Sequence, residues 1–493
     1  MSSGASTSEQ QAAAGATTVI NTNLLGAASG TNDTNDTNDT NDTNDTNDTN
    51  GNGGNGGNGA EGMPQRVLTV KDAVFLTVGI VIGAGIFKAP SLVAGAAGSE
   101  SMMILAWVLG GVITLLGALT YAELTSTFPH AGGDYHFLHL AYGKRLAFLF
   151  AWARTTVITT GSIALLAFVF GDYCAQLLPL GEFGSAIYAC LVVLLLTVIH
   201  WISTRASSTT QNWLTGLEIG GLVLVAVAGF MATPAAAAVP AVASSTSAAF
   251  GFAMVMVMLT FGGWNEVAYV SSEMSSDKRG IARALIASIL VVTVLYLVVN
   301  LAYLQALGLQ GMAQSSAVAA DVLKATFGPT GAVLMSVIVA IATLTSINST
   351  LIVGARSSYA AGRDWPALRF LGAWNADGST PRHALLVQAV IALALIVLGA
   401  ATRKGFETMV DYTAPVFWFF FLLCGLSVFI LRRKHANVER PFRVPLYPVV
   451  PALFCIACAW LLYSSLAYVK TGALYGAGLL VIGAIISLFL DKK

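Results

Sequence analysis

The sequence predicts an all-α integral membrane protein with twelve transmembrane helices, of which the first and the sixth are broken. Composition indicates the membrane, because 55% of the 493 residues are hydrophobic and only 10% are charged, whereas soluble domains carry about 25% charged residues. From Gln65 onward the chain contains twelve apolar segments, each near the ~20 residues that a helix needs to cross a bilayer. The expected spans are 72–97, 103–128, 145–178, 184–203, 213–232, 248–275, 283–307, 331–361, 383–401, 407–431, 447–468 and 473–490.

The distribution of Lys and Arg predicts the orientation, because basic residues gather in cytoplasmic loops. One set of alternate loops carries Lys144, Arg145, Arg205, Lys278, Arg279, Arg283, Arg363, Arg369, Arg382, Arg432, Arg433, Lys434, Arg440 and Arg443. The opposite loops offer only Lys324, Arg403, Lys404 and Lys470. With an even number of spans, we expect both termini in the cytoplasm and the protein in the plasma (inner) membrane. A net charge of zero argues against a nucleic-acid partner.

The first 64 residues differ from the rest of the chain. Thr31–Asn50 repeats Thr-Asn-Asp, and a Gly-Asn tract follows it. Such a segment has almost no apolar side chains to bury and is typical of disorder. We therefore expect residues 1–64 to form a disordered low-complexity cytoplasmic tail, and residues 65–493 to form the membrane domain.

The first span contains an interruption where a helix should be regular. Its stretch Val78–Pro90 includes Gly79, Gly83 and Gly85, and Pro90 cannot donate a backbone hydrogen bond. Broken backbone at membrane depth is tolerated only where it is buried in protein or lines a wet cavity. Taken alone, these glycines could equally serve close helix packing.

The sixth span is interrupted as well, by Gly262 and Gly263 and by the polar pair Asn265 and Glu266. Two breaks five spans apart indicate two inverted five-helix repeats that hold a ligand site between their broken helices. This pattern favours a transport site over simple packing. The expected units are inverted repeats at about 72–232 and 248–431, followed by two trailing helices at about 447–490.

Motifs spread along the chain agree in order and spacing with one known family. They are Ile82-Gly-Ala-Gly-Ile-Phe87, Tyr121-Ala-Glu123, Gly132-Gly-Asp-Tyr135, Phe261-Gly-Gly-Trp-Asn265, Gly354-Ala-Arg356 and Arg440-Pro-Phe-Arg-Val-Pro-Leu-Tyr-Pro448. From about residue 68 to the end, the chain resembles the amino acid–polyamine–organocation superfamily, and most closely its L-type branch. The resemblance implies an amino acid permease.

The resemblance also implies where an amino acid would bind. Backbone amides around Gly83–Ile86 would hold the α-carboxylate, a role that suits free N–H groups at the start of a half-helix. Carbonyl groups near Ile80–Ile82 and Phe261–Gly263 would accept from the α-ammonium, and Phe261 and Trp264 would shape the side-chain pocket. The candidate binding residues are Ile82, Gly83, Ala84, Gly85, Ile86, Phe261, Gly262, Gly263 and Trp264.

Three features depart from the family pattern. Glu218 lies in the fifth span, where many relatives carry a lysine, and Lys88 directly follows the first-span motif. A carboxyl group in an apolar setting is costly and can carry a proton, so Glu218 is the candidate coupling residue. The alternative is a structural ion pair of Glu218 with Arg154 or Lys88. The loop Pro179–Gly184 lacks the cysteine that joins animal relatives to a glycoprotein, so no disulfide-linked subunit is expected.

Other charged residues at or near membrane depth are secondary candidates. Glu266 follows the second break and would face substrate or water in a vestibule. Glu123 and Glu273 lie near predicted cytoplasmic ends, where they would pair with loop arginines and could form an inner gate. The role of Arg154, in the long third span, stays open.

Metal and enzyme chemistry receive little support. Asp134, His136 and His139 lie close together in the sequence, but the family motif accounts for Asp134, and the histidines fall on a predicted cytoplasmic surface. Cys455 and Cys458 form a CxxC inside a predicted span. The sequence contains no nucleophile elbow, phosphate loop or zinc motif, so we expect neither an enzyme nor a cofactor.

These observations favour a secondary active transporter of amino acids that works by alternating access. The mostly apolar pocket favours a neutral amino acid, with proton coupling and exchange both open. Within transport, the alternative is a carrier of cationic amino acids or polyamines, served by Glu266 or Glu218. From other classes, a non-translocating amino acid sensor or a channel fits the same pattern.

Overall fold

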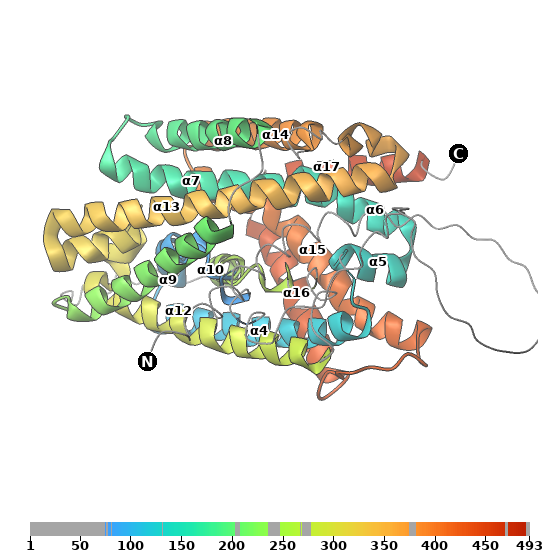
Figure 1. The fold of residues 1–493 in the computed structure, drawn as a ribbon. Coiled ribbons are helices and arrows are strands. Elements are labelled where there is room, and N and C mark those ends of the chain that lie inside the picture. The colour runs from blue at the N-terminus through green and yellow to red at the C-terminus, as the bar shows by residue number, and fades with distance from the viewer. Residues whose placement is uncertain are drawn as a thin grey trace, which may run out of the picture.

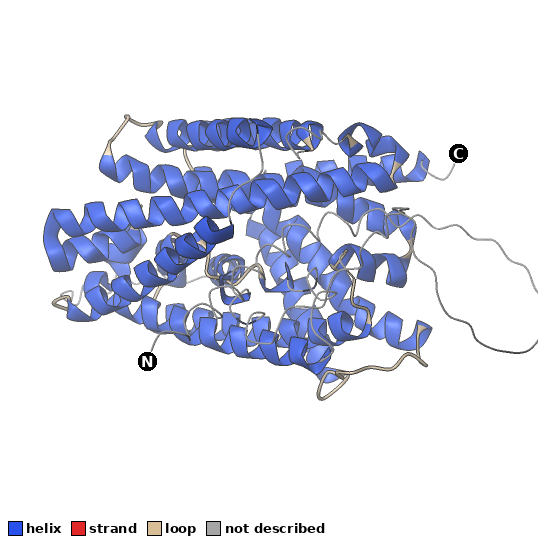
Figure 2. Cartoon of the chain, in the orientation of Figure 1, coloured by secondary structure: helices blue, strands red, loops and turns tan. Residues whose placement is uncertain are grey.

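The computed structural model describes residues 74, 77–79, 81–130, 132–202, 208–234, 247–266, 268, 278–373, 381–468 and 472–489. These residues form a bundle of helices, and no strand occurs among them (Figures 1 and 2). The all-α prediction is therefore confirmed. The low-complexity tail, Ile80 and the gate candidate Glu273 lie outside the described residues.

Most of the expected spans appear as unbroken apolar helices. Eight of the described stretches of helix are long and apolar enough to cross a membrane. They are α4 (Glu100–Thr127), the third span (Lys144–Leu177), α8 (Gly184–Ile202), α12 (Lys278–Gln314), α13 (Val318–Asp364), α14 (Arg382–Thr402), α15 (Gly405–Lys434) and α16 (Val449–Tyr468). Two further helices, α9 (Ser208–Met231) and α17 (Gly472–Phe489), contain shorter apolar stretches. With the two broken spans, these helices account for the twelve segments that the sequence predicts.

The broken spans are the first and the sixth, as expected. The first continues as the short 3₁₀ helix η1 (Ala84–Phe87) and then as α3 (Ala89–Ala97). The sixth consists of α10 (Ser247–Thr260) and the 3₁₀ turn η3 (Trp264–Glu266). In both spans the regular helix stops at the glycines that the sequence singles out.

The third span contains a local widening of the helix. It is built from α6 (Lys144–Ala153), the π-helical turn η2 (Arg154–Ile158) and α7 (Thr159–Leu177). Single π-helical turns are rare and occur frequently at functional sites. The sequence predicts the length of this span but not the π-helical turn, which begins at Arg154.

Two helical segments outside the spans were not predicted. α12 bends at Gly308 (φ 67°), and α13 bends at Gly328 (φ 70°), which precedes Pro329. The segment between these bends, residues 309–327, lies at one end of the bundle, and α5 (Asp134–Tyr142) lies at the other (Figure 1). Each segment follows the second helix of a predicted repeat, and their placement at opposite ends agrees with inverted repeats.

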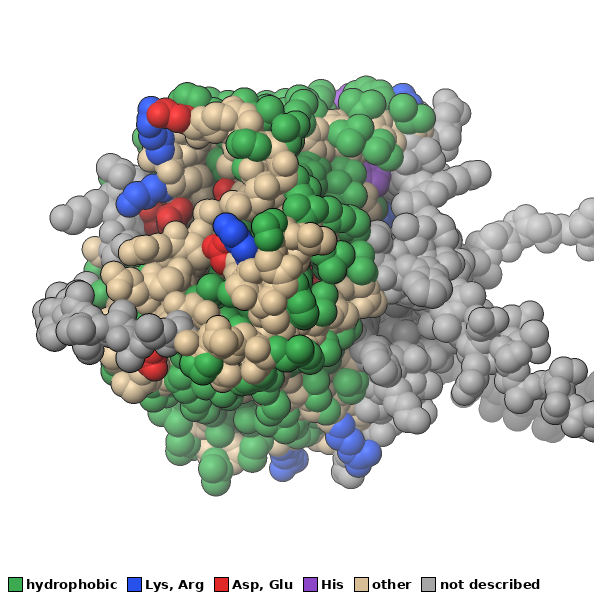
Figure 3. Space-filling view, turned by 90° about the vertical axis from the view of Figure 1, so that its left-hand side faces the viewer, with side chains coloured by type: hydrophobic (Ala, Val, Ile, Leu, Met, Phe, Trp, Pro, Cys, Tyr) green, Lys and Arg blue, Asp and Glu red, His purple; other side chains and the backbone are tan. Residues whose placement is uncertain are grey.

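At the end that carries residues 309–327, hydrophobic side chains lie among uncharged groups and backbone, with a few charged side chains between them (Figure 3). Along the sides of the bundle, many large apolar side chains are exposed, including Leu195, Val294, Val397 and Ile456. Such a surface suits contact with lipid rather than water.

Candidate functional site

The first break leaves backbone groups without helical partners. Gly83 is extended (φ −113°, ψ −178°), and its amide donates to the Val81 carbonyl at 2.9 Å. The 3₁₀ helix that follows starts with the amides of Ala84 and Gly85, which have no acceptor inside that short helix. Of the amides expected to hold a carboxylate, that of Gly83 therefore already has an acceptor, and the binding of a carboxylate by Ala84 and Gly85 stays a prediction.

The carbonyl groups around this break accept hydrogen bonds from buried tyrosine hydroxyls. Tyr296 of α12 donates to Val81 at 2.8 Å and lies 3.2 Å from the Thr260 carbonyl at the end of α10. Tyr173 of α7 donates to Phe87 at 2.7 Å. One hydroxyl group thus touches both breaks. The sequence analysis missed these tyrosines, although a tyrosine buried inside an apolar span needs a hydrogen-bond partner.

The two breaks lie against each other. A Cβ atom placed on Gly85 would be 3.4 Å from the Cα of Thr260, so the backbones touch there. A Cβ atom placed on Gly83 would meet nothing within 4 Å. Gly263, with φ 97°, adopts the left-handed conformation that glycine tolerates best. The structure therefore joins the breaks and leaves space beside Gly83.

The aromatic candidates of the sixth break are fully packed. Phe261 lies 5.0 Å from Tyr296 between ring centroids, and Trp264 lies 4.9 Å from Tyr121. Trp264 also contacts Phe421 and Phe454, and both candidates are at most 2% exposed. Glycines of α4 make room for them: a Cβ on Gly110 would lie 3.2 Å from Phe261, and one on Gly117 would lie 2.9 Å from Trp264. These glycines are seven residues apart on one helix face, a signal that the sequence analysis did not use.

The polar residues of the sixth break bind other elements. Glu266 pairs with Arg154 at the start of the π-helical turn, with 3.3 Å between the charged groups. The amide group of Asn265 donates to the carboxyl group of Asp134 in α5 at 3.1 Å. Asp134 and Asn265 are 3% and 5% exposed. The break is therefore held by side chains from two neighbouring segments.

Lys88 connects the first span to residues 309–327, the segment at the end of the bundle away from α5. Its ammonium lies 2.7 Å from the carboxylate of Asp172 in α7, and it donates to the carbonyl of Ser316 at 3.1 Å. Ser185 of α8 donates to the other Asp172 oxygen at 2.7 Å. Ser316 belongs to the segment between the bends of α12 and α13. Lys88 thus ties that segment to the helix that follows the first break.

Glu218 of α9 is 4% exposed, and its Oε1 has no hydrogen-bond partner among the described residues. The ion pair considered for it with Arg154 or Lys88 is wrong, because Arg154 pairs with Glu266 and Lys88 with Asp172. Sequence reasoning could not select these partners, since all of the groups lie far apart in the chain. The coupling role of Glu218 stays a prediction.

Glu123 does pair with arginines beyond the tenth span, as predicted. Its carboxylate accepts from Arg432 at 2.7 and 2.5 Å and from the amide of Val444 at 2.7 Å, and it lies 3.4 Å from Arg440. The carboxylate is buried and has partners on both oxygens. It therefore fastens the end of α4 to the loop that contains the Arg440–Pro448 motif.

Two groups of possible metal ligands remain, the histidines at α5 and the cysteines of the CxxC motif. His130 and His136 stack at 4.1 Å, and burial lowers the pKa of His130 and lowers that of His136 to about 4. Cys455 and Cys458 are buried in α16. Within the described part of the chain, no group of three or more His, Cys, Asp or Glu residues could hold a metal ion.

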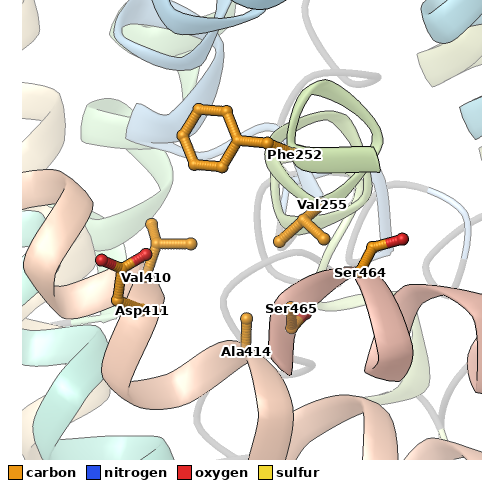
Figure 4. A pocket seen from close by; sticks show the side chains of 7 residues that line it. All are labelled: Phe252, Val255, Val410, Asp411, Ala414, Ser464 and Ser465. Atoms are coloured by element: carbon orange, nitrogen blue, oxygen red, sulfur yellow. The ribbon is translucent and has the colours of Figure 1, made fainter. Parts of the chain in front are cut away.

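A small pocket lies between α10, α15 and α16 (Figure 4). It is lined by Phe252, Val255, Val410, Asp411, Ala414, Ser464 and Ser465. Asp411 supplies the only charge in this lining. Phe252 lies on α10, nine residues before Phe261, so the pocket lies along that helix before the break and includes none of the expected binding residues.

Comparisons with known proteins agree with this arrangement. The family model described as "Amino acid permease" matches residues 68–486. The serine/threonine exchanger SteT of Bacillus subtilis is 27% identical over 80% of this chain and 90% of its own length. The b(0,+)-type amino acid transporter 1 of Mus musculus is 27% identical over 79% of this chain and 81% of its own. The mouse large neutral amino acids transporter small subunit 2 is 29% identical over 77% of this chain and 73% of its own.

The match spans both breaks, the third span and the trailing helices. It confirms the resemblance to the amino acid–polyamine–organocation superfamily and to its L-type branch. The family and these relatives are transporters rather than enzymes. This membrane protein, with its two broken helices meeting at one point, belongs to the amino acid permease family.

Proposed function

We propose that this protein is a secondary active transporter that carries neutral amino acids across the plasma (inner) membrane by alternating access. One observation carries the proposal: the two broken helices touch at Gly85 and Thr260, beside open space at Gly83. An amino acid placed there would meet the amides of Ala84 and Gly85 in the first break and, in place of the Tyr296 hydroxyl, the carbonyl of Thr260 at the second. Both termini would lie in the cytoplasm, on the side of α5.

The backbone of the substrate would be recognised by backbone groups of the protein. Its carboxylate would accept from the amides of Ala84 and Gly85, where a helix start favours negative charge. Its ammonium would donate to the carbonyls of Val81 and Thr260, which Tyr296 reaches in this structure. Binding would then displace the tyrosine hydroxyl from at least one carbonyl.

The surroundings favour a neutral side chain. Ile82, Ile86 and Phe261 are apolar and buried, and the acid nearest to the second break, Glu266, pairs with Arg154. The names of two relatives, a serine/threonine exchanger and a transporter of large neutral amino acids, point the same way and support exchange. A cationic substrate would instead need Glu218, whose Oε1 has no partner among the described residues.

Counterflow into proteoliposomes that contain the purified chain alone tests this function. Trans-stimulated uptake of a neutral amino acid is expected, without a disulfide-linked subunit. Binding without flux would indicate a sensor, and flux without trans-stimulation would indicate a channel. Equal uptake of an amino acid and of its decarboxylated amine would contradict carboxylate recognition and would favour a polyamine carrier.

Gly83→Ala tests the location of the site. The backbone of Gly83 suits any residue, and a Cβ there meets no atom within 4 Å, so the variant should fold as the wild type does. Its methyl group would enter the proposed substrate space, and we expect at least tenfold weaker binding, about 1.4 kcal/mol. Gly220→Ala, which also places a Cβ in open space but on α9, is the matched control. Equal binding by both variants would move the site elsewhere.

Glu218→Gln tests coupling. If Glu218 carries the coupled proton, the variant should keep substrate binding and exchange but lose uptake driven by a proton gradient, because glutamine does not titrate. Uptake should be measured under imposed proton and sodium gradients. Proton-driven uptake that persists in the variant would exclude Glu218 as the carrier, and sodium-driven uptake would identify the rival ion.

A further inference from the structure

Asp134 is a buried acid that directly contacts the sixth break, and the proposed mechanism does not use it. Its Oδ2 accepts from Asn265 at 3.1 Å, while its Oδ1 has no hydrogen-bond partner among the described residues. The residue is 3% exposed and begins α5, the helical segment at the predicted cytoplasmic end. An ionised carboxylate in this position would bury a net negative charge near the Glu266 carboxylate, which is costly.

A protonated carboxyl group keeps the contact with Asn265 and removes the buried charge beside Glu266. The hydrogen can reside on Oδ1, while Oδ2 still accepts from Asn265. Charged and titratable groups face the Asp134 carboxyl group from the elements packed against it: Tyr121 of α4, Arg154 of η2, Glu266 of η3 and Cys424 of α15. Arg154 pairs with Glu266, so it does not serve Asp134 alone.

We propose that Asp134 binds a proton while the sixth break is closed against α5, and that opening of this side releases the proton. Opening separates Asn265 from Asp134 and admits water, which favours the ionised carboxylate. Proton release and opening are thereby linked, since each favours the other. The inference rests on the proposed transport function and assigns to it a proton-binding residue outside the spans.

The ionisation behaviour agrees with this geometry. Burial, and after it the Glu266 carboxylate, raise the pKa of Asp134 from its ordinary value to about 7, although Arg154, Asn265 and Tyr121 act in the opposite direction. The closed state therefore holds the proton more tightly than a hydrated Asp134 would. Raising the pH through 7 should favour the open state. His136, with a pKa of about 4, does not titrate in this range.

Exchange in proteoliposomes with equal pH on both sides tests the proposal. When opening limits the rate, wild-type exchange should rise about tenfold from about pH 6 to about pH 8. Asp134→Asn stays neutral, so its exchange should be slow and should change less than about twofold over that range. His139→Gln, which changes another titratable side chain of α5, is the control that should keep the rise. A rise in Asp134→Asn equal to that of the wild type would overturn the proposal.

Thermal unfolding across the same pH values gives a second readout that needs no transport. Because the folded protein binds the proton more tightly than the unfolded chain, wild-type stability should fall between about pH 4 and about pH 7 relative to Asp134→Asn. Above pH 7 the difference should be constant. A pH-independent difference would show that Asp134 takes up no proton and would overturn the proposal. Normal titration without exchange at any pH would instead contradict the transport function alone.

Discussion

At the break in the first span, freed carbonyl groups accept from neutral tyrosine hydroxyls, whereas the break in the sixth span is held by aromatic rings and charged partners. Tyr296 and Tyr173 reach the first break from other spans, and space remains beside Gly83. At the sixth break, Trp264 is packed in an aromatic cluster and Glu266 pairs with Arg154. The first break thus offers backbone groups to a ligand, and the sixth is fastened through side chains.

The difference suggests a division of roles. Hydroxyl groups can be displaced by a ligand that brings its own donors, because they carry no net charge that must be compensated. Packed rings and ion pairs resist gradual deformation, so they suit a gate that is either closed or open. The variants below test whether the two breaks differ in this way.

The largest effect is expected from Trp264→Ala. Removing a ring that contacts Tyr121, Phe421 and Phe454 leaves a cavity and should lower the free energy of unfolding by about 3–5 kcal/mol. Thermal unfolding in detergent measures the loss. Trp264→Phe keeps a ring and should retain most of the stability. The ranking of substrates should change as well; if it does not, Trp264 acts in packing only.

A smaller effect is expected from Lys88→Met. The variant keeps the length of the side chain but leaves the largely buried Asp172 without its cation, which should cost about 2–3 kcal/mol. Arg403→Met is the matched control, because the pair of Arg403 with Glu182 is mostly exposed and should contribute less than about 1 kcal/mol. Equal losses in the two variants would show that Lys88 does not hold the 309–327 segment.

The smallest effect is expected from Tyr296→Phe. Loss of the hydroxyl removes the buried donor that the Val81 and Thr260 carbonyls share, although Val81 keeps the Gly83 amide, and should cost about 1–2 kcal/mol without substrate. Substrate should restore part of that stability if its ammonium takes the same carbonyls. Tyr303→Phe, whose bond to Ile86 is long at 3.4 Å, should cost less. If substrate raises the melting temperature of Tyr296→Phe no more than it raises that of the wild type, substrate does not displace the Tyr296 hydroxyl.

The sequence by itself determined the membrane class, the twelve spans and the positions of both breaks. These features are local: a run of apolar residues predicts a span, and glycine or proline within it predicts an interruption, without knowledge of the neighbours. The candidate binding residues followed from the same local signals and from the family motifs. The pairing of Glu123 with arginines was also predictable, because buried carboxylates near basic loops need cations.

Only the tertiary structure decided which distant groups meet. Glu218 was expected to pair with Arg154 or Lys88, yet those cations pair with Glu266 and Asp172. A hydrogen bond or ion pair depends on angles and distances of a few ångströms, and the hydropathy of a span fixes neither its rotation nor its depth. For the same reason, the reach of Tyr296 to both breaks and the burial of Asp134 beneath Asn265 emerge only when the helices are packed.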